Sequence, residues 1–240
     1  MIPIYITGSG VVAAIGVGKE ATLAALQAEE TGIRKLKYLD SCHEELPVGE
    51  VQLSNHEMNQ LMGVADDIRH TRTALMGRLA LREALKEARL ERDDLKAIPF
   101  ISATTVGGMD RREAYYAEEA NCDLVHAEIS THHCGTSTEM IAEPFGEFAS
   151  MATLSTACSS ATNALITGAN MLRCGMADIV VVGGSESLSK FHLNGFNALM
   201  ILDHEQCRPF DRNRAGLNLG EGAAYLVLET EASVKRRGVK

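Results

Sequence analysis

The chain has 240 residues, of which 45% are apolar, and a formal net charge of −9 at pH 7. It is therefore long enough for one large core or two small ones, and too acidic for nucleic acid to be its main partner. Its six cysteines form no CxxC pair, so we expect reduced thiols. No apolar run is long enough to cross a membrane, and the N-terminus lacks the basic start of a signal peptide. We therefore expect a cytoplasmic protein with no membrane association.

Apolar periodicity predicts strands and helices in alternation along the chain. In chain order we expect a strand at 2–6, a helix at 19–28, an amphipathic helix at 69–89, a strand at 99–103, a helix at 110–119, a strand at 149–154, a helix at 161–173, and strands at 178–182 and 222–229. The polar stretches 31–60 and 120–148 support no regular assignment. The alternation predicts an α/β fold with a mixed or mostly parallel sheet flanked by helices.

The glycine-rich segment Gly8–Ala13 follows the first predicted strand and resembles a dinucleotide-binding fingerprint. Glu29 and Glu30 stand at a suitable distance for a ribose contact, but no strand is predicted to end there. A nucleotide-binding oxidoreductase is therefore a weak alternative. We favour a turn whose glycines let the backbone pack closely.

A second cluster has residue types that could ligate zinc. Its members are Cys122, His126, His132, His133 and Cys134. Their spacing matches no common zinc site, and nothing in the segment repeats in the manner of a zinc finger. We expect a polar loop here and no bound metal.

Cys158 lies between a β-prone stretch that ends at Leu154 and a run of small, helix-compatible residues that begins at Ala161. At the N-terminus of a helix, unpaired N–H groups and the helix dipole favour the thiolate over the thiol. The thiolate is the nucleophilic form of cysteine. This position therefore suits an acyl-accepting cysteine, and the competing interpretation is a buried, inert thiol.

Four motifs follow in order around Cys158. They are Ser155–Ala161, Gly175–Glu186, Arg208–Gly216 and Gly220–Ala224. Together with the opening Ile6–Gly10 segment, this ordered set closely resembles the N-terminal half of β-ketoacyl-(acyl carrier protein) synthases, the condensing enzymes of fatty acid and polyketide biosynthesis. The resemblance implies a thiolase-like fold, with residues 1–240 as the N-terminal domain, a sheet of about five strands, and a homodimer or a heterodimer with a related subunit.

The resemblance also implies a reaction. Cys158 would take an acyl group from an acyl carrier protein, and the enolate of a decarboxylated malonyl-carrier protein would then attack the acyl-cysteine. No metal or diffusible cofactor is implied, because the phosphopantetheine arm arrives on the carrier protein.

Further roles follow from the matching positions. Val106 corresponds to a residue whose size influences which acyl chains fit, and Phe196 to an aromatic near the site entrance, although either could be ordinary core. The Cys158 N–H corresponds to one oxyanion-hole donor. Arg69 and Arg72, beside the helix at 69–89, are candidates for carrier-protein docking, with a solvated helix face as the alternative; Arg78 is expected on that same solvated face.

The sequence departs from the family in what it lacks. The two histidine motifs of the family's second half are missing, and His192 and His204 stand in other contexts. Met200 also replaces a basic residue that many family members use for docking. We therefore expect a truncated fragment that acylates at Cys158 without condensing. A non-catalytic partner resembling a chain-length factor is the alternative, although such subunits usually lack the nucleophile.

Overall fold

The computed structural model describes residues 3–67, 69–114 and 130–239. Its strands form one mixed six-stranded sheet in the order β2-β1-β6-β5-β3-β4. They are β1 (Ile4–Ala13), β2 (Gly16–Val17), β3 (Pro99–Ala103), β4 (Ser150–Leu154), β5 (Ile179–Glu186) and β6 (Gly222–Thr230). β3 runs parallel to β4 and β5, whereas β6 runs antiparallel to β5 and β1. The predicted α/β class with a mixed sheet is confirmed.

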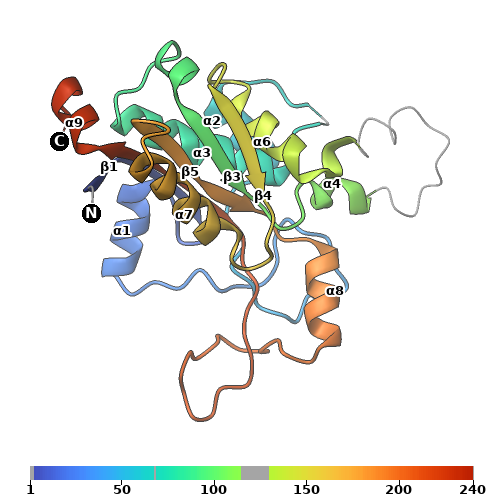
Figure 1. Cartoon of the computed structure of the whole chain (residues 1–240). Coiled ribbons are helices and arrows are strands. Elements are labelled where there is room, and N and C mark those ends of the chain that lie inside the picture. The colour runs from blue at the N-terminus through green and yellow to red at the C-terminus, as the bar shows by residue number, and fades with distance from the viewer. Residues whose placement is uncertain (1–2, 68, 115–129, 240) are drawn as a thin grey trace.

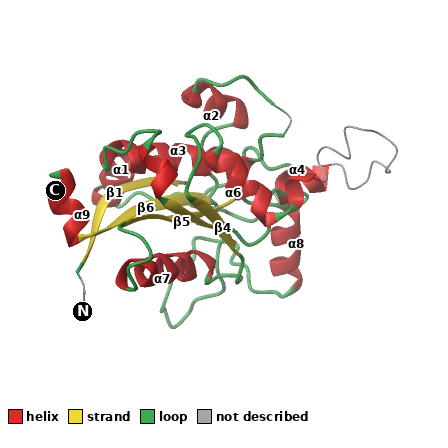
Figure 2. Ribbon diagram, turned by 45° about the horizontal axis from the view of Figure 1, so that its top comes forward, coloured by secondary structure: helices red, strands yellow, loops and turns green. Residues whose placement is uncertain are grey.

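Helices cover both faces of this sheet (Figure 1). They are α1 (Lys19–Gln27), α2 (Asn55–Met62), α3 (Arg72–Glu87), α4 (Met109–Ala114), α6 (Cys134–Ala142), α7 (Ser160–Arg173), α8 (Lys190–Ala198) and α9 (Glu231–Arg237), with 3₁₀ turns at Asp94–Ala97 and Ser130–His132. Figure 2 shows α2, α3 and α6 on one side of the sheet and α7 on the other, with both chain ends at the same end of the molecule. No helix in the described ranges is long and apolar enough to cross a membrane.

β1 continues far beyond the predicted end at residue 6, because Gly8–Ala13 pairs with β6 instead of turning. The glycines permit this by close packing against α3. A Cβ atom on Gly10 would lie 2.0 Å from the Ala80 carbonyl oxygen, and one on Gly8 would lie 2.2 Å from the Ala84 carbonyl oxygen. The expected close backbone approach is therefore confirmed, but it occurs in a strand and not in a turn.

The stretch 31–60 is not wholly irregular, because α2 begins within it. Ser54 caps this helix, and a capping box joins the Ser54 hydroxyl and the Glu57 carboxylate to each other's backbone N–H groups at 3.2 and 2.7 Å. The helix ends at Gly63 in the left-handed conformation. This Ser-x-x-Glu pattern was a local signal for a helix start that apolar periodicity alone does not detect.

The prediction that Arg72 and Arg78 lie on a solvated face of α3 is wrong, because they are only 8% and 1% exposed. The Arg78 guanidinium donates to the Met140 carbonyl oxygen at 2.8 Å and pairs with the Glu143 carboxylate at 3.0 Å. A buried guanidinium is tolerated when its donors are satisfied in this way. Beyond α3, α4 accounts for the start of the helix predicted at 110–119, and the rest of that helix lies outside the described residues.

Candidate active site

Cys158 lies exposed on a tight turn between β4 and α7. Ala157, just before it, has φ 52°, a left-handed conformation that costs a non-glycine residue about 1–3 kcal/mol. The buried Ser160 hydroxyl holds the turn, since it accepts from the Thr156 N–H at 2.8 Å and donates to the Ala157 carbonyl oxygen at 2.6 Å. The predicted strand–cysteine–helix junction is therefore present, and Cys158 is exposed instead of buried in the core.

A cavity of about 380 Å³ opens beside Cys158, at the carboxyl ends of the parallel strands β3 and β5. In α/β sheets this is the edge where ligands usually bind. The cavity is lined by Val11, Val12, Ala103, Thr104, Thr105, Ala157, Cys158, Ser160, Ala161, Gly184, Ser185, Glu186, Gly222, Ala223 and Ala224. Gly184 lets α7 start close to β5, because a Cβ atom there would lie 3.3 Å from the Ala161 side chain.

Glu186, at the end of β5, is a polar residue of this cavity that the sequence did not single out. Its carboxylate accepts from the Thr104 hydroxyl at 3.1 Å and from the Thr105 backbone N–H. A glutamate that follows an apolar strand normally suggests a solvated strand end. Its role in holding the loop after β3 becomes visible only in three dimensions.

Val106 directly follows the lining residue Thr105 and is half-buried, but it is not among the side chains that border this cavity. Phe196 is half-buried on α8 and also lies outside the lining set. Their roles in acyl-chain selection and at the site entrance stay predictions, as does the oxyanion role of the Cys158 N–H.

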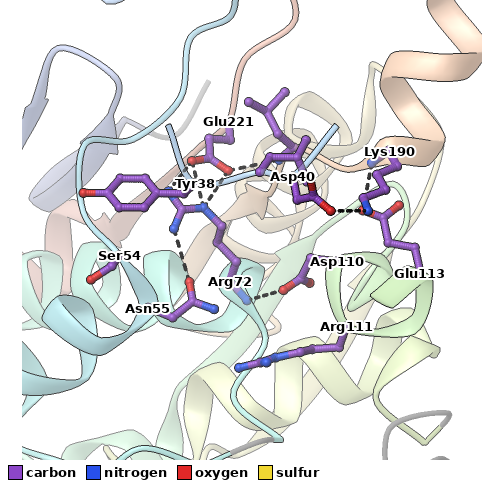
Figure 3. A pocket seen from close by; sticks show the side chains of 12 residues that line it. Tyr38, Asp40, Ser54, Asn55, Arg72, Asp110, Arg111, Glu113, Lys190 and Glu221 are labelled. Atoms are coloured by element: carbon purple, nitrogen blue, oxygen red, sulfur yellow. Dashed lines mark hydrogen bonds and ion pairs between the residues drawn. The ribbon is translucent and has the colours of Figure 1, made fainter. Parts of the chain in front are cut away.

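Arg72 is the centre of a second hollow of about 430 Å³ (Figure 3). Its guanidinium pairs with the buried Glu221 carboxylate at 2.6 Å and donates to the carbonyl oxygens of Val51 and Leu53 at 2.8 and 2.9 Å. Because these donors are engaged inside the protein, the predicted docking role of Arg72 does not fit its position. Arg69 is exposed and pairs with Asp67 at 2.6 Å, so docking at Arg69 stays a prediction.

Two acidic side chains of the same hollow cap helices. Asp110 accepts from the Arg72 backbone N–H at 2.8 Å, and burial raises its pKa to about 6. Glu113 accepts from the N–H groups of Lys190 and Phe191 at 2.7 and 3.0 Å, and burial raises its pKa as well. Figure 3 shows the Asp110 carboxylate beside Arg72 and the Glu113 carboxylate beside Lys190. The charged side chains that line this hollow are thus engaged in a structural ion pair and in hydrogen bonds to backbone N–H groups at helix starts.

The predicted cysteine–histidine cluster lies partly outside the described residues, because Cys122 and His126 do. His133 caps α6 by accepting from the Gly135 N–H at 3.0 Å, and the Cys134 thiol donates to the Thr105 carbonyl oxygen at 3.7 Å. Within the described ranges, no three His, Cys, Asp or Glu side chains are grouped so that they could hold a metal ion. His133 and Cys134 have structural contacts, and Cys134 contacts the loop that borders the Cys158 cavity.

Known proteins resemble this chain in sequence and in fold. Residues 1–233 match the family model for the β-ketoacyl synthase N-terminal domain. Nodulation protein E of Rhizobium sp. (strain N33) is 30% identical over 78% of this chain, and the tetracenomycin polyketide synthase ketoacyl synthase alpha subunit of Streptomyces glaucescens is 29% identical over 98%. The ishigamide ketosynthase/chain length factor structure superimposes on the whole chain with a TM-score of 0.87 and 27% identity.

The matches cover most of this chain but a smaller share of each relative. The chain spans 47% of the length of that nodulation protein, 59% of the tetracenomycin subunit, and 61% of the ishigamide chain. The family match itself extends over nearly all of the chain. The fold is the thiolase-like fold of ketosynthases, and the protein belongs to the β-ketoacyl synthase family of condensing enzymes, whose N-terminal domain it matches.

Proposed function

We propose that Cys158 is the acyl-accepting nucleophile of a 3-oxoacyl-[acyl-carrier-protein] synthase. The observation that carries this proposal is the exposed thiol on a strained, hydrogen-bonded turn that opens onto a cavity at the carboxyl ends of β3 and β5. A fixed and accessible thiol beside a cavity of this size meets the geometric needs of covalent acyl transfer.

The proposed reaction has two stages. First, the Cys158 thiolate attacks the carbonyl carbon of an acyl-carrier thioester, the new sulfur–carbon bond forms, and the phosphopantetheine thiolate leaves and takes up a proton. Second, a malonyl-carrier thioester loses CO₂, and its enolate carbon attacks the acyl-cysteine carbonyl and expels the Cys158 thiolate. Neither stage uses a metal or a diffusible cofactor, since the phosphopantetheine is part of the carrier protein.

The described residues at the cavity include a nucleophile for the first stage, but they include fewer of the groups that the second stage needs. Among the described residues that line the Cys158 cavity there is no histidine, lysine or arginine to stabilise the malonyl enolate. Loss of one such preorganised donor typically lowers a rate by about 10²–10³-fold. We therefore propose that residues 1–240 act as the acylation domain of the enzyme, and that condensation requires groups from outside this domain.

The proposed partners follow from this chemistry. The acyl donor is an acyl carrier protein, and the assembly is a homodimer or a heterodimer with a related subunit, in the cytoplasm. The similar ishigamide structure is a ketosynthase/chain length factor, which supports a partner of the same family.

Mass spectrometry of the protein after incubation with an acyl-carrier protein tests the proposal. We expect one acyl group on the tryptic peptide that contains Cys158, and none in Cys158→Ala. Cys174→Ala is the matched control, because Cys174 is also exposed but lies at the end of α7, away from the cavity. Acylation that persists in Cys158→Ala would contradict the assignment.

The second candidate is a non-catalytic partner subunit of the chain-length-factor type, which the similar ketosynthase/chain length factor structure brings into consideration. The exposed Cys158 thiol favours a catalytic role over that of a non-catalytic partner. If wild-type protein stays unacylated but binds a related ketosynthase in size-exclusion chromatography, the partner role replaces the catalytic one.

A further inference from the structure

We infer that Glu186 is a positioning residue that fixes the Thr104–Val106 loop at the Cys158 cavity and so determines which acyl-chain lengths Cys158 accepts. This inference rests on the proposed acyl-transfer function. It concerns a carboxylate that touches the loop and not the reacting atoms, so Glu186 acts through the loop.

The first step of the argument is the set of contacts that Glu186 makes. One carboxylate oxygen accepts from the Thr104 hydroxyl at 3.1 Å and from the Val106 N–H at 3.5 Å, and the other accepts from the Thr105 N–H. In the described parts of the chain, Glu186 forms no ion pair with a basic side chain. Its charge is therefore directed at neutral donors of one loop, and charge-assisted bonds of this kind are about twice as strong as neutral ones.

The second step is that the same loop is held from its other side. The Thr105 carbonyl oxygen accepts from the Ser155 hydroxyl at 3.2 Å and from the Cys134 thiol at 3.7 Å. The Thr104 N–H donates to the Leu154 carbonyl oxygen at 3.2 Å. The loop is thus joined both to Glu186 and to the end of β4, just before the Cys158 turn.

The third step is location. Glu186, Thr104 and Thr105 line the same cavity as Cys158. A displacement of the loop would therefore move a wall of this cavity, and with it Val106, the residue predicted to limit acyl-chain size. A misplacement of about 1 Å can change a rate by about 10²-fold, so a change at Glu186 would alter acyl transfer selectively by chain length.

Glu50 offers a matched control elsewhere in the molecule. Its buried carboxylate also accepts from consecutive backbone N–H groups of a loop, those of Lys37, Tyr38 and Leu39, at 2.8–3.2 Å. Glu50 does not line the Cys158 cavity. Glu50→Gln and Glu186→Gln therefore make the same chemical change in the same kind of contact, and of the two residues only Glu186 lines the cavity that Cys158 lines.

The experiment measures acylation of Cys158 by short-, medium- and long-chain acyl-carrier thioesters, with thermal unfolding recorded for each variant. We expect Glu186→Gln to change the long-to-short rate ratio about tenfold, and Glu186→Asp, which keeps the charge on a shorter side chain, to change it less. Glu50→Gln should lower the unfolding temperature without changing the ratio. An unchanged ratio in both folded Glu186 variants, or an equal change in Glu50→Gln, would overturn the inference.

A chemical probe separates this inference from the proposed function. N-alkylmaleimides of increasing chain length label thiols without enzymatic transfer, and the exposed Cys174 serves as the internal reference. A shifted chain-length profile of maleimide labelling at Cys158 in Glu186→Gln supports the positioning role, whether or not the wild type forms an acyl-enzyme. If the wild type forms no acyl-enzyme, only the proposed function is contradicted. If the wild type is acylated and neither profile shifts, the positioning role fails and the proposed function stands.

Discussion

The two faces of the sheet are built differently. On one face, twelve of the sixteen α3 residues are buried, two arginines among them. On the other face, only four of the fourteen α7 residues are buried, and Leu165 and Ile166 remain 36% and 52% exposed. We therefore expect the α3 face to be sensitive to changes in backbone distance and charge pairing, whereas α7 packs through a single narrow stripe. The candidate nucleophile stands at the start of the sparsely covered helix.

Glycine substitutions should produce the largest difference in stability between the two faces. A Cβ atom on Gly10 would lie 2.0 Å from a backbone oxygen of α3, whereas one on Gly168 in α7 would lie 2.3 Å from a methyl group of Val182. We expect Gly10→Ala to cost more than about 4 kcal/mol or to prevent folding. Gly168→Ala should cost about 1–3 kcal/mol, since α7 is open on its outer side and can shift. Urea denaturation measures both.

Gly195→Ala is the control for this series. Gly195 lies within α8, and a Cβ atom there meets nothing within 4 Å. Alanine should therefore be neutral or stabilise by up to about 1 kcal/mol, as expected for a helix interior. If Gly10→Ala were as mild as Gly195→Ala, α3 could not be packed on β1 as described.

The buried ion pair of α3 gives the next largest effect. Arg72→Met leaves the Glu221 carboxylate buried without its partner, and removing one member of such a pair typically costs about 3–5 kcal/mol. Arg69→Met breaks the exposed pair with Asp67 and should cost far less, because solvent screens an exposed ion pair. Chemical denaturation of the two variants compares them directly, and equal losses would contradict the burial of Arg72.

Arg72 and Arg78 also show which features of the fold could not be predicted from the sequence. The five predicted strands are present because continuous or alternating apolar runs carry their own signal, and the turn at Cys158 was predictable from its immediate neighbours. The burial of Arg72 was not, since its partner Glu221 is 149 positions away and periodicity describes only the local face of a helix.

The candidate site also contains one residue that could be predicted from the sequence and one that could not. Cys158 could be identified from a contiguous motif, whereas Glu186 needs the pairing of β5 beside β3 to reach the Thr104–Val106 loop. Short helices such as α8 were missed because their starts depend on caps, here the Ser189 hydroxyl that accepts from the His192 N–H. A contact between distant segments leaves no periodic trace in the sequence.

The stability of the α3 face should also depend on pH, because a buried carboxyl group lies against it. The folded-state pKa of Asp110, raised by burial to about 6, lies above the ordinary value of 3.8 for an aspartate carboxyl group. Between these values the folded state keeps a proton that the unfolded state has lost, so the contribution of Asp110 to stability is present at low pH and declines as pH rises from about 4 to 6. The full decline corresponds to roughly 3 kcal/mol.

Asp110→Asn isolates this contribution, since asparagine keeps an oxygen that accepts from the Arg72 N–H but does not titrate. The difference in unfolding free energy between wild type and variant should fall between pH 4 and 6 and then level off. Burial also lowers the pKa of His70, but that titration is common to both proteins and largely cancels in the difference. A flat difference curve would show that Asp110 is not buried in the folded protein.

The smallest effect is expected on the outer side of α7. Ile166 is 52% exposed, whereas Leu172 on the inner stripe is 1% exposed. Leu172→Ala should cost about 2–5 kcal/mol, and Ile166→Ser should stay within about 0.5 kcal/mol, as measured by urea denaturation of the isolated chain. A loss in Ile166→Ser as large as that in Leu172→Ala would mean that this side of α7 is covered in solution, and light scattering would then show whether a second copy covers it. If the loss is small, α7 is held by its inner stripe alone, and the start of the helix, with Cys158, is anchored mainly by the Ser160 hydrogen bonds and the close approach at Gly184.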